Sequence, residues 1–481
     1  MPPHVLRQRL SDLDTQIAHH ESIIQEFNQQ RSAILSELSL VTYPVLTLPP
    51  EVTAEIFKWC LDTGLRLLPS VAPLLLTRIC RQWRALALST PALWDRMNEI
   101  EFDVHPRTET FIETWFNRAG TRPLSLGIVC PDSVHLDSLQ SVILRHASRL
   151  QSLDVMADSD SLWNLTAVQS FPILSKLELY SLGEFDEREG YIQLFEIDGA
   201  PVLRQLSLEQ VLPSMVTMPW AQLTKMTLVL IPLSECLNAL RWATSLREFE
   251  RHSLPEDDDQ IISPQLSPVN HSCLISLIVL PRGDEDILPL LTLPCLQSLE
   301  LGGRFCKYQE YLDDDVVPFL SRVSGTLRTF KVGMSPTVPV QWLHPFTQLT
   351  TLELVRSTES PFKTDIIRAL DRRTSPDLLP KLQSFVFAEC RSNQVDDELL
   401  DTLGSRCDVT DEAHARLESF SLIWPEFDYS SDAPTARLPL VNVLPLRALA
   451  RRGMRIHIGT RDQNSFTDRI VRQDCTSFPT D

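Results

Sequence analysis

The sequence predicts an α/β protein with three parts: a long N-terminal helix, a small all-helical unit, and an irregular solenoid of short strands and helices. Three observations support this prediction. Apolar residues recur at heptad spacing over residues 6–38, two short amphipathic helical patterns follow within 44–97, and the pattern L-x-x-L-x-L recurs eleven times from residue 150 onward. The chain has 481 residues, enough for several domains. We place the parts at 1–40, 44–97 and 98–460, and expect 461–481 to be a flexible tail.

The first segment predicts a coiled-coil helix. Apolar side chains fill eight of its ten core positions, and the other two, a histidine and an arginine, can fix the register of the seam. At about 1.5 Å per residue the helix would be about 50 Å long. The pattern indicates a homodimer through 6–38; the alternatives are a helix packed on its own chain and a single helix. One register holds Leu6, Leu13, His20, Phe27 and Ile34, and the other Leu10, Ile17, Ile24, Arg31 and Leu38.

Residues 44–97 predict two amphipathic helices. Within 51–61, Val52, Ile56 and Trp59 share one stripe, and Pro50 suits a first turn. A second pattern after Pro73 predicts one helix that ends at Thr90-Pro91 and carries Leu75, Ile79, Trp83 and Leu86. A unit this small cannot cover all its apolar faces, so we expect some of them to bind a partner. The alternative is a helical hairpin inside a larger core.

These residues resemble the F-box, in the form frequent among fungal F-box proteins. The match consists of Leu48-Pro49-Pro50-Glu51-Val52, Glu55-Ile56-Phe57, Ile79-Cys80-Arg81-Gln82-Trp83-Arg84 and Pro91-Ala92-Leu93-Trp94. The stretch 62–70 is longer and more irregular than the family's hairpin, which leaves the length of the central helix open. The resemblance implies a surface that docks a Skp-family adaptor and, through it, a cullin–RING ubiquitin ligase. The residues implied to form or brace this surface are Leu48, Pro49, Ile56, Leu75, Ile79, Trp83 and Trp94.

The eleven copies of L-x-x-L-x-L predict short strands. Their last two apolar positions alternate with polar ones, as in a strand that is buried on one face, and the first leucine turns inward just before the strand. Helical patterns lie between some copies, at 108–119, at 234–243 with Ser234 as a candidate cap, and at 440–452; Gly453 then leads to a final strand at 456–458. The copies start 20 to 35 residues apart, at Leu150, Leu174, Leu203, Leu223, Leu246, Leu274, Leu296, Leu327, Leu349, Leu382 and Leu417.

This repeat resembles that of leucine-rich repeat proteins over most of 98–460. The family's asparagine after the strand is absent, and its places are held by residues such as Asp158, Leu182 and Cys390, so the curvature stays open. The alternative is a globular α/β domain with leucine-rich strands. The resemblance implies that a concave strand face binds a target protein, whose identity the sequence does not specify. The candidates for this face are Glu178, Tyr180, Ile278, Glu300, Lys331 and Glu353, among outward positions that also include Asp154, Lys176, Glu209, Lys225, Glu248, Glu250, Ser276, Thr351, Ser384 and Ser421; for any single one, a solvated strand face is the simpler interpretation.

Composition narrows the class of protein. A net charge of −19 argues against binding to nucleic acid or to an anionic membrane surface, and no apolar run approaches the roughly 18 residues that span a bilayer. None of the ten cysteines forms a C-x-x-C pair, and the N-terminal sequence lacks an apolar signal segment. We expect reduced cysteines and a location in the cytoplasm, the nucleus or both.

No catalytic motif is found. The sequence lacks a glycine-rich phosphate loop, an H-E-x-x-H zinc motif and a G-x-S-x-G elbow, and neither Cys390 nor Cys407 has a histidine tied to it by a local signature. We expect no enzyme activity, no cofactor and no metal. The sequence therefore favours a substrate-recognition adaptor of an SCF-type ubiquitin ligase. The alternatives are a protein-interaction scaffold that works without ubiquitin, through the coiled coil and the repeat surface, and, remotely, a hydrolase in an irregular α/β fold.

Overall fold

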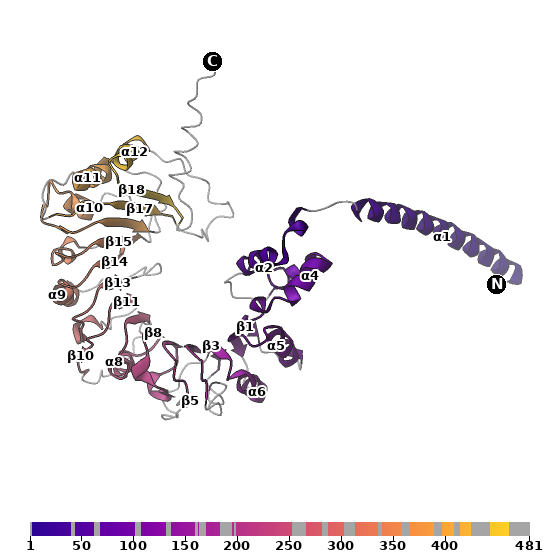
Figure 1. Ribbon diagram of the computed structural model, residues 1–481, viewed down its shortest axis with the longest axis horizontal. Helices are drawn as coiled ribbons and strands as arrows, with labels where there is room; N and C mark the ends of the chain where they lie inside the picture. Colours follow the sequence, from indigo (N-terminus) through magenta and orange to yellow (C-terminus); the bar gives the residue numbers. More distant parts are fainter. Residues whose placement is uncertain are drawn as a thin grey trace, which may run out of the picture. The chain divides into compact units, whose positions relative to one another are not determined.

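Figure 1 shows the fold as a computed structural model. The structure describes residues 2–39, 44–61, 68–101, 107–130, 136–158, 162, 170–182, 195–196, 199–252, 266–280, 287–302, 313–334, 339–356, 365–388, 397–407, 414–424 and 443–460. The chain divides into two compact units. Residues 1–95 with 117–120 form the first, called here the helical unit, and residues 96–116 with 121–481 form the second, called the sheet unit.

The helical unit consists of helices and turns. They are α1 (Pro3–Ser39), η1 (Pro44–Thr47), α2 (Pro50–Trp59), α3 (Leu76–Ile79), α4 (Arg81–Leu88) and η2 (Pro91–Leu93). Proline at the start of α2 fits, because the first N–H groups of a helix have no intrahelical partner. The long N-terminal helix that the heptads predict is confirmed.

The single helix predicted after Pro73 is wrong, because the structure interrupts it at Cys80. This residue is extended, with φ −153° and ψ 168°, and it separates α3 from α4. Its Sγ accepts a hydrogen bond from the backbone N–H of Trp83 at 3.4 Å, so Cys80 caps the second helix. Apolar spacing continues across the break, which explains why the sequence pattern does not reveal it.

The sheet unit is built around one parallel sheet of fourteen strands in the described residues. Their order in the sheet follows their order in the chain. Its strands are β1 (Arg96–Glu101), β2 (Leu124–Cys130), β3 (Leu150–Ala157), β4 (Lys176–Ser181), β6 (Gln205–Glu209), β8 (Lys225–Val229), β9 (Glu248–His252), β11 (Ser276–Leu280), β13 (Ser298–Leu301), β14 (Thr329–Met334), β15 (Thr351–Arg356), β16 (Ser384–Ala388), β17 (Ser419–Ile423) and β18 (Arg455–Gly459). Two further parallel pairs join β5 (Phe195–Glu196) to β7 (Val216–Thr217) and β10 (Val269–Asn270) to β12 (Leu291–Thr292).

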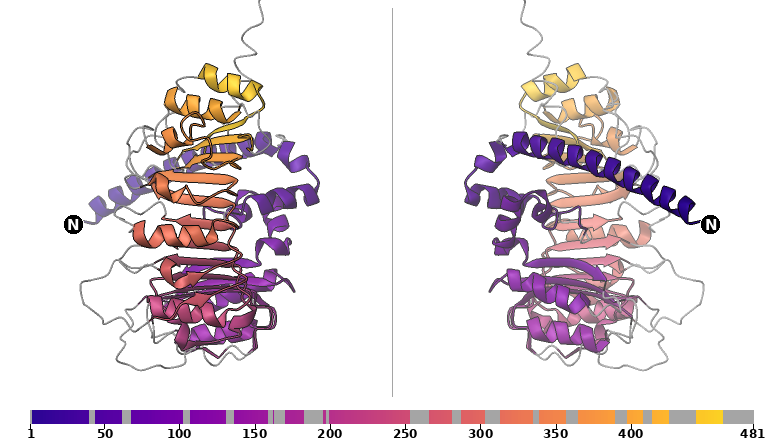
Figure 2. Two further views of the ribbon diagram at one scale, coloured as in Figure 1. Left: turned by 90° about the vertical axis from the view of Figure 1, so that its left-hand side faces the viewer. Right: turned by 90° about the vertical axis from the view of Figure 1, so that its right-hand side faces the viewer.

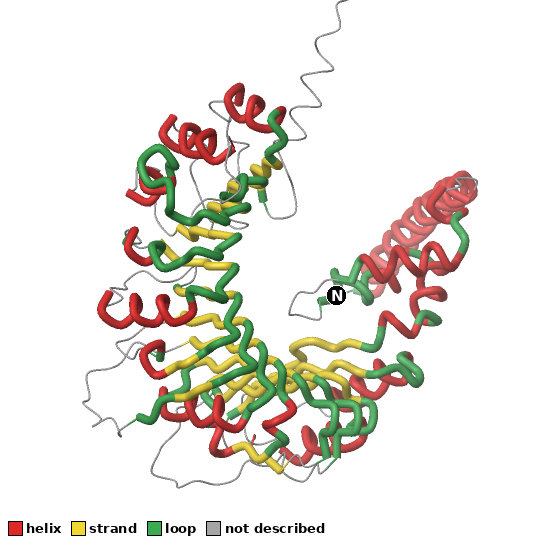
Figure 3. The backbone as a smooth tube through the Cα atoms, turned by 60° about the vertical axis from the view of Figure 1, so that its left-hand side comes forward, coloured by secondary structure: helices red, strands yellow, loops and turns green. Residues whose placement is uncertain are grey.

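Helices of the sheet unit lie along one face of the large sheet, and Figures 1 and 3 show α8 to α12 on that face. The two side views of Figure 2 show the strands running side by side. The helices are α5 (Arg107–Arg118), α6 (Leu136–His146), α8 (Leu233–Trp242), α9 (Asp313–Val323), α10 (Asp365–Leu370), α11 (Asp397–Cys407) and α12 (Val443–Arg451). Short 3-10 turns are η6 (Pro213–Met215), η7 (Trp220–Gln222), η8 (Leu288–Leu290) and η9 (Val340–Trp342).

The core of the sheet unit is the inward side of the strands. Every one of the eleven predicted copies contains a strand, and the leucine that opens each copy is at most 1% exposed. Inward and outward positions alternate in burial along β4 and β11, for example. The α/β class is confirmed, and the assignment as a leucine-rich-repeat solenoid stays a prediction.

Helix boundaries outside the repeats are close to the predicted ones. Helix α8 begins at Leu233 after Pro232, so the predicted cap at Ser234 is wrong. Helix α5 ends near Gly120, whose φ of +62° favours glycine, and α12 is followed by Gly453 at φ +93° and then β18, as predicted. Residues 440–442 and the tail 461–481 lie outside the described residues.

Candidate functional site

Helices α2 and α3 expose large apolar side chains. On α2, Val52, Ile56 and Trp59 are 45%, 41% and 88% exposed, and they share one stripe of the helix. Ile79 on α3 is 52% exposed, and Leu75, the residue before that helix, is 41% exposed. Single exposed apolar residues are ordinary on a protein surface, but five on two helical segments of one small unit indicate an interaction surface. These five residues are called the exposed apolar residues of α2 and α3.

The opposite side of α2 is held by a small core. Phe57 is fully buried and meets Trp83 edge to face, with ring centroids 4.9 Å apart. Trp94 is also fully buried; its Nε1–H donates to the carbonyl of Ala87 at 2.8 Å, and the guanidinium of Arg118 lies 4.4 Å from its ring centroid. The unit therefore holds its fold with inner side chains and leaves the outer ones of α2 and α3 uncovered in the described residues.

The residues predicted to form the docking surface divide by burial. Pro49, Ile56, Leu75 and Ile79 are exposed, and Leu48 and Trp83 are half-buried. Because Trp94 is buried, it can only brace such a surface. The predicted set lacked Val52 and Trp59, although their helical spacing to Ile56 was the signal that identified them as one stripe.

The outward face of the large sheet carries its side chains in rows. Register pairs join Ile278 to Glu300, Glu300 to Lys331, and Lys331 to Glu353 on β11, β13, β14 and β15. Four of the six predicted target-face residues thus stand side by side. The same row, called here the central row, holds Asp154, Glu178, Ser207, Thr227, Glu250, Ile278, Glu300, Lys331, Glu353, Val386 and Ser421.

Opposite charges in this face pair with each other. Lys331 Nζ lies 2.8 Å from a carboxylate oxygen of Glu300 and 3.9 Å from one of Glu353, so one cation bridges two neighbouring strands. On β4, Lys176 pairs with Glu178 at 2.7 Å, two residues along the same strand. Tyr180 lies in the adjacent row, in register with Glu209. Glu178 and Tyr180 are separated from Ile278 by strands β6, β8 and β9.

At the end of β9, His252, which the sequence pattern did not identify, joins the predicted outward residue Glu250. Nε2 of His252 lies 2.7 Å from a carboxylate oxygen of Glu250, and this hydrogen bond is the main reason why the pKa of Glu250 is lowered. In contrast, desolvation raises the pKa of Glu209 on β6. The copy that begins at Leu246 is the weakest of the eleven, so its last strand residue was not identified as an outward position.

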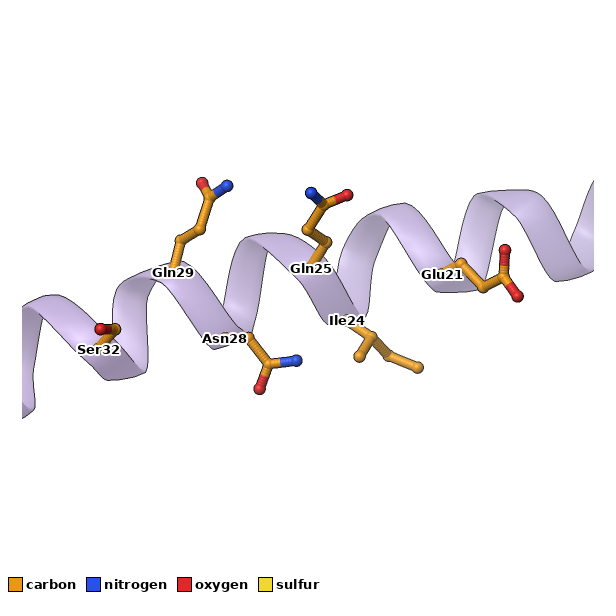
Figure 4. A pocket seen from close by; sticks show the side chains of 6 residues that line it. All are labelled: Glu21, Ile24, Gln25, Asn28, Gln29 and Ser32. Atoms are coloured by element: carbon orange, nitrogen blue, oxygen red, sulfur yellow. The ribbon is translucent and has the colours of Figure 1, made fainter.

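Potential metal ligands are scattered over the residues that the structure describes. No group of three or more His, Cys, Asp and Glu side chains is placed to hold a metal ion there. Cys407 is buried, and burial raises the pKa of its thiol, which works against a nucleophilic role; Cys390 lies outside the described residues. A depression lies on α1, between side chains from Glu21 to Ser32 that point in different directions, so it does not enclose a small molecule (Figure 4).

Comparison with protein families and with curated proteins gives no match. No family model matches the sequence, and no curated protein is significantly similar to it. The F-box and leucine-rich-repeat resemblances therefore stay predictions that depend on the motifs. Across the residues with described placement, no helix is long and apolar enough to cross a membrane.

Proposed function

We propose that this chain is the substrate-recognition adaptor of an SCF-type cullin–RING ubiquitin ligase, in the cytoplasm, the nucleus or both. The helical unit docks a Skp-family adaptor, and the outward face of the large sheet, as a leucine-rich-repeat surface, binds the target protein. The chain has no catalytic activity of its own. It acts by proximity, because holding a target lysine near the charged conjugating enzyme raises its effective concentration.

The observation that carries this proposal is the exposure of apolar side chains on α2 and α3. These segments follow the Leu48-Pro49 start and precede the Cys80-to-Trp83 stretch, which together define the F-box resemblance. Burying one such side chain stabilises a complex by roughly 1.5–3 kcal/mol before the costs of association. Ile56, Trp59 and Ile79 can therefore supply most of the energy of a partner interface.

The central row supports the second half of the proposal. It presents mixed charges and hydroxyls on a rigid sheet, with Ile278 as an apolar position beside Glu300. A pair such as Lys331–Glu300 can exchange its internal contact for one with a charged target residue. Extended strand faces of repeat proteins commonly serve as protein-binding surfaces.

The test is co-purification of the full chain with a Skp-family adaptor. The double variant Ile56→Asp with Ile79→Asp is expected to lose binding, because it places two charges in the interface while touching no core residue. Leu48→Ala with Pro49→Ala is expected to weaken it. The matched control is Leu144→Asp on α6, which is 47% exposed and belongs to the sheet unit. Unchanged binding by the folded double variant would contradict the docking assignment.

The runner-up is a scaffold that works without ubiquitin, and one observation favours it. Helix α1 exposes a long apolar stripe that the F-box resemblance does not explain. Failure of the wild-type chain to bind any Skp-family adaptor, together with self-association through α1, would favour the scaffold.

A further inference from the structure

Helix α1 leaves an apolar stripe uncovered, which His20 and Arg31 interrupt. The side chains of Leu10, Ile17, Ile24, Phe27 and Ile34 are 54% to 62% exposed, and they occupy the two core positions of the heptad pattern. The remaining exposed members of the stripe are Leu6 and Leu13, while the side chain of Leu38 lies outside the described part of the helix. A second helix with the same apolar spacing would bury this stripe.

The opposite side of the helix is polar. Figure 4 shows Ile24 and Asn28 on one side of α1 and Gln25 and Gln29 on the other. With Leu10, Ile17 and Ile24 at heptad position a, and Leu6, Leu13 and Phe27 at position d, the flanking positions e and g hold residues such as Arg9, Asp14, Glu21 and Glu37. An amphipathic stripe bordered by charges of both signs is typical of a two-stranded coiled coil.

We propose that α1 forms an antiparallel homodimer, in which the occupant of the apolar stripe is α1 of a second copy of this chain. This inference does not depend on the proposed ligase function. The charged residues that border the stripe favour a second α1 as the partner helix and favour its antiparallel direction.

In an antiparallel pair, a positions face d positions of the other copy. Position e then faces e, and g faces g. Leu10 then packs against Ile34 of the second copy, and Ile17 against Phe27. In this alignment Arg9 lies near Glu37 of the second copy, because both occupy position g.

In the antiparallel pair, the two polar core residues, His20 and Arg31, also lie beside residues that suit them. Arg31 faces Leu13 of the second copy. It also lies next to Asp14 of the second copy, which occupies the e position beside that leucine. His20 faces Ile24 of the second copy. Symmetry gives two Arg9–Glu37 pairs and two Arg31–Asp14 pairs, against one unfavourable approach of the two Glu21 side chains at the centre.

A parallel pair satisfies fewer charges. It would bring Arg9 near Asp14 of the second copy, which is favourable. However, it would also place the two Arg31 side chains opposite each other in the core, with Gln30 rather than a carboxylate beside them. Desolvating two like charges is costly, so the antiparallel direction is favoured. Arg9, Asp14, Arg31 and Glu37 are all exposed in the single chain and available for these contacts.

The direction has a structural consequence for the dimer. Helix α1 has 37 residues, and at about 1.5 Å per residue it is about 55 Å long. An antiparallel pair puts the two C-terminal ends of α1 at opposite ends of this rod. The two copies of the remaining chain therefore leave the rod at separate points rather than together.

The first experiment measures the mass of the full chain by sedimentation velocity at micromolar concentrations. The wild-type chain is expected to sediment as a dimer, Ile24→Asp as a monomer, and the matched control Gln25→Asp as a dimer, because Gln25 is on the polar side. A wild-type monomer at tens of micromolar would overturn the proposal. Equal effects of the two variants would overturn the assignment of the seam.

The second experiment determines the direction by charge reversal. Arg9→Glu is expected to weaken dimerisation about tenfold, because two attractive pairs become repulsive. Adding Glu37→Arg restores the affinity if the pair is antiparallel, and adding Asp14→Arg instead weakens it further by facing Arg31. Rescue by Asp14→Arg and not by Glu37→Arg would show a parallel pair and overturn the proposed direction.

Discussion

The helical unit and the sheet unit differ in how far they bury their large apolar side chains. In the sheet unit, inward residues such as Leu277, Leu299 and Phe330 are fully buried by the unit itself. In the helical unit, α1 and α2 carry equally large apolar residues that stay exposed, among them Phe27 and Trp59 at 62% and 88%. The same residue types therefore serve internal stability in one unit and association in the other.

The difference separates two consequences of mutation. A change on the inner side of the sheet should lower the free energy of unfolding, whereas a change on α2 or α3 should leave it nearly unchanged and alter binding. The predictions below test that separation, beginning with the largest effect.

Truncation of a core aromatic residue should cost the most. Phe330 on β14 is fully buried and packs on Phe346 with ring centroids 5.4 Å apart. Phe330→Ala is expected to lower the free energy of unfolding by about 3–5 kcal/mol, because it removes apolar contacts and leaves a cavity. Ile79→Ala, the comparison variant in α3, should cost below about 0.5 kcal/mol. Denaturant unfolding measures both, and similar costs would erase the contrast between the units.

Loss of the buried guanidinium of Arg406 should have the second largest effect on the free energy of unfolding. Arg406 is 1% exposed, and it donates to the carbonyls of Leu370, Leu378 and Leu379 at 2.6, 2.8 and 3.1 Å. Desolvation lowers its pKa to about 10, so it stays charged at neutral pH. Arg406→Met should cost about 2–3 kcal/mol because three buried acceptors lose their donors.

Arg406→Lys is the control for this position. It keeps the charge but not the fork of donors, so it should restore only part of the loss. Full restoration of stability by lysine in thermal unfolding would mean that charge, rather than hydrogen-bond geometry, is what the site requires.

The ion pairs of Lys331 with Glu300 and Glu353 in the central row should contribute little to the free energy of unfolding. The side chains of Lys331, Glu300 and Glu353 are 19% to 24% exposed, and ion pairs near the surface contribute about 0–1 kcal/mol. Lys331→Met is therefore expected to cost at most about 1 kcal/mol, and the cost should shrink at high salt. A much larger cost, measured by denaturant unfolding, would assign this row to structure rather than to target binding.

The smallest effect concerns pH. Burial is the main cause of the lowered pKa of His146 on α6, with Glu113 acting in the opposite direction. Because the folded pKa lies below the unfolded value of about 6.5, this group favours the folded state fully above that pH, and its contribution falls as pH drops below it. Comparison of unfolding at pH 7.5 and 5.5 should show a smaller difference for His146→Gln than for the wild type. An unchanged difference would contradict this assignment.

The repeat strands were predictable because each carries its own signal. In a copy such as Leu296-Gln297-Ser298-Leu299-Glu300-Leu301, the residues that turn inward are set by local alternation, and the structure places a strand at every copy. Strands β1 and β2 were missed because they lack the pattern: β1 reads R-M-N-E-I-E, and β2 has few polar positions.

The candidate site was predictable only in part, because exposure depends on tertiary packing. Trp59 and Trp94 both lie in the F-box-like stretch, yet one is 88% exposed and the other is buried against Ala87 and Arg118. Nothing local separates them. The break at Cys80 was hidden for the same reason, since apolar spacing continues from Ile79 to Trp83 across the extended residue.

Hydrogen exchange of the full chain with and without a Skp-family adaptor tests the central claim most directly. The account predicts slower exchange of backbone amides in α2 (Pro50–Trp59) and α3 (Leu76–Ile79) when the adaptor is present, and unchanged exchange in strands β11 to β15. Slower exchange in those strands with none in α2 and α3, or no change anywhere at saturating adaptor, would contradict it.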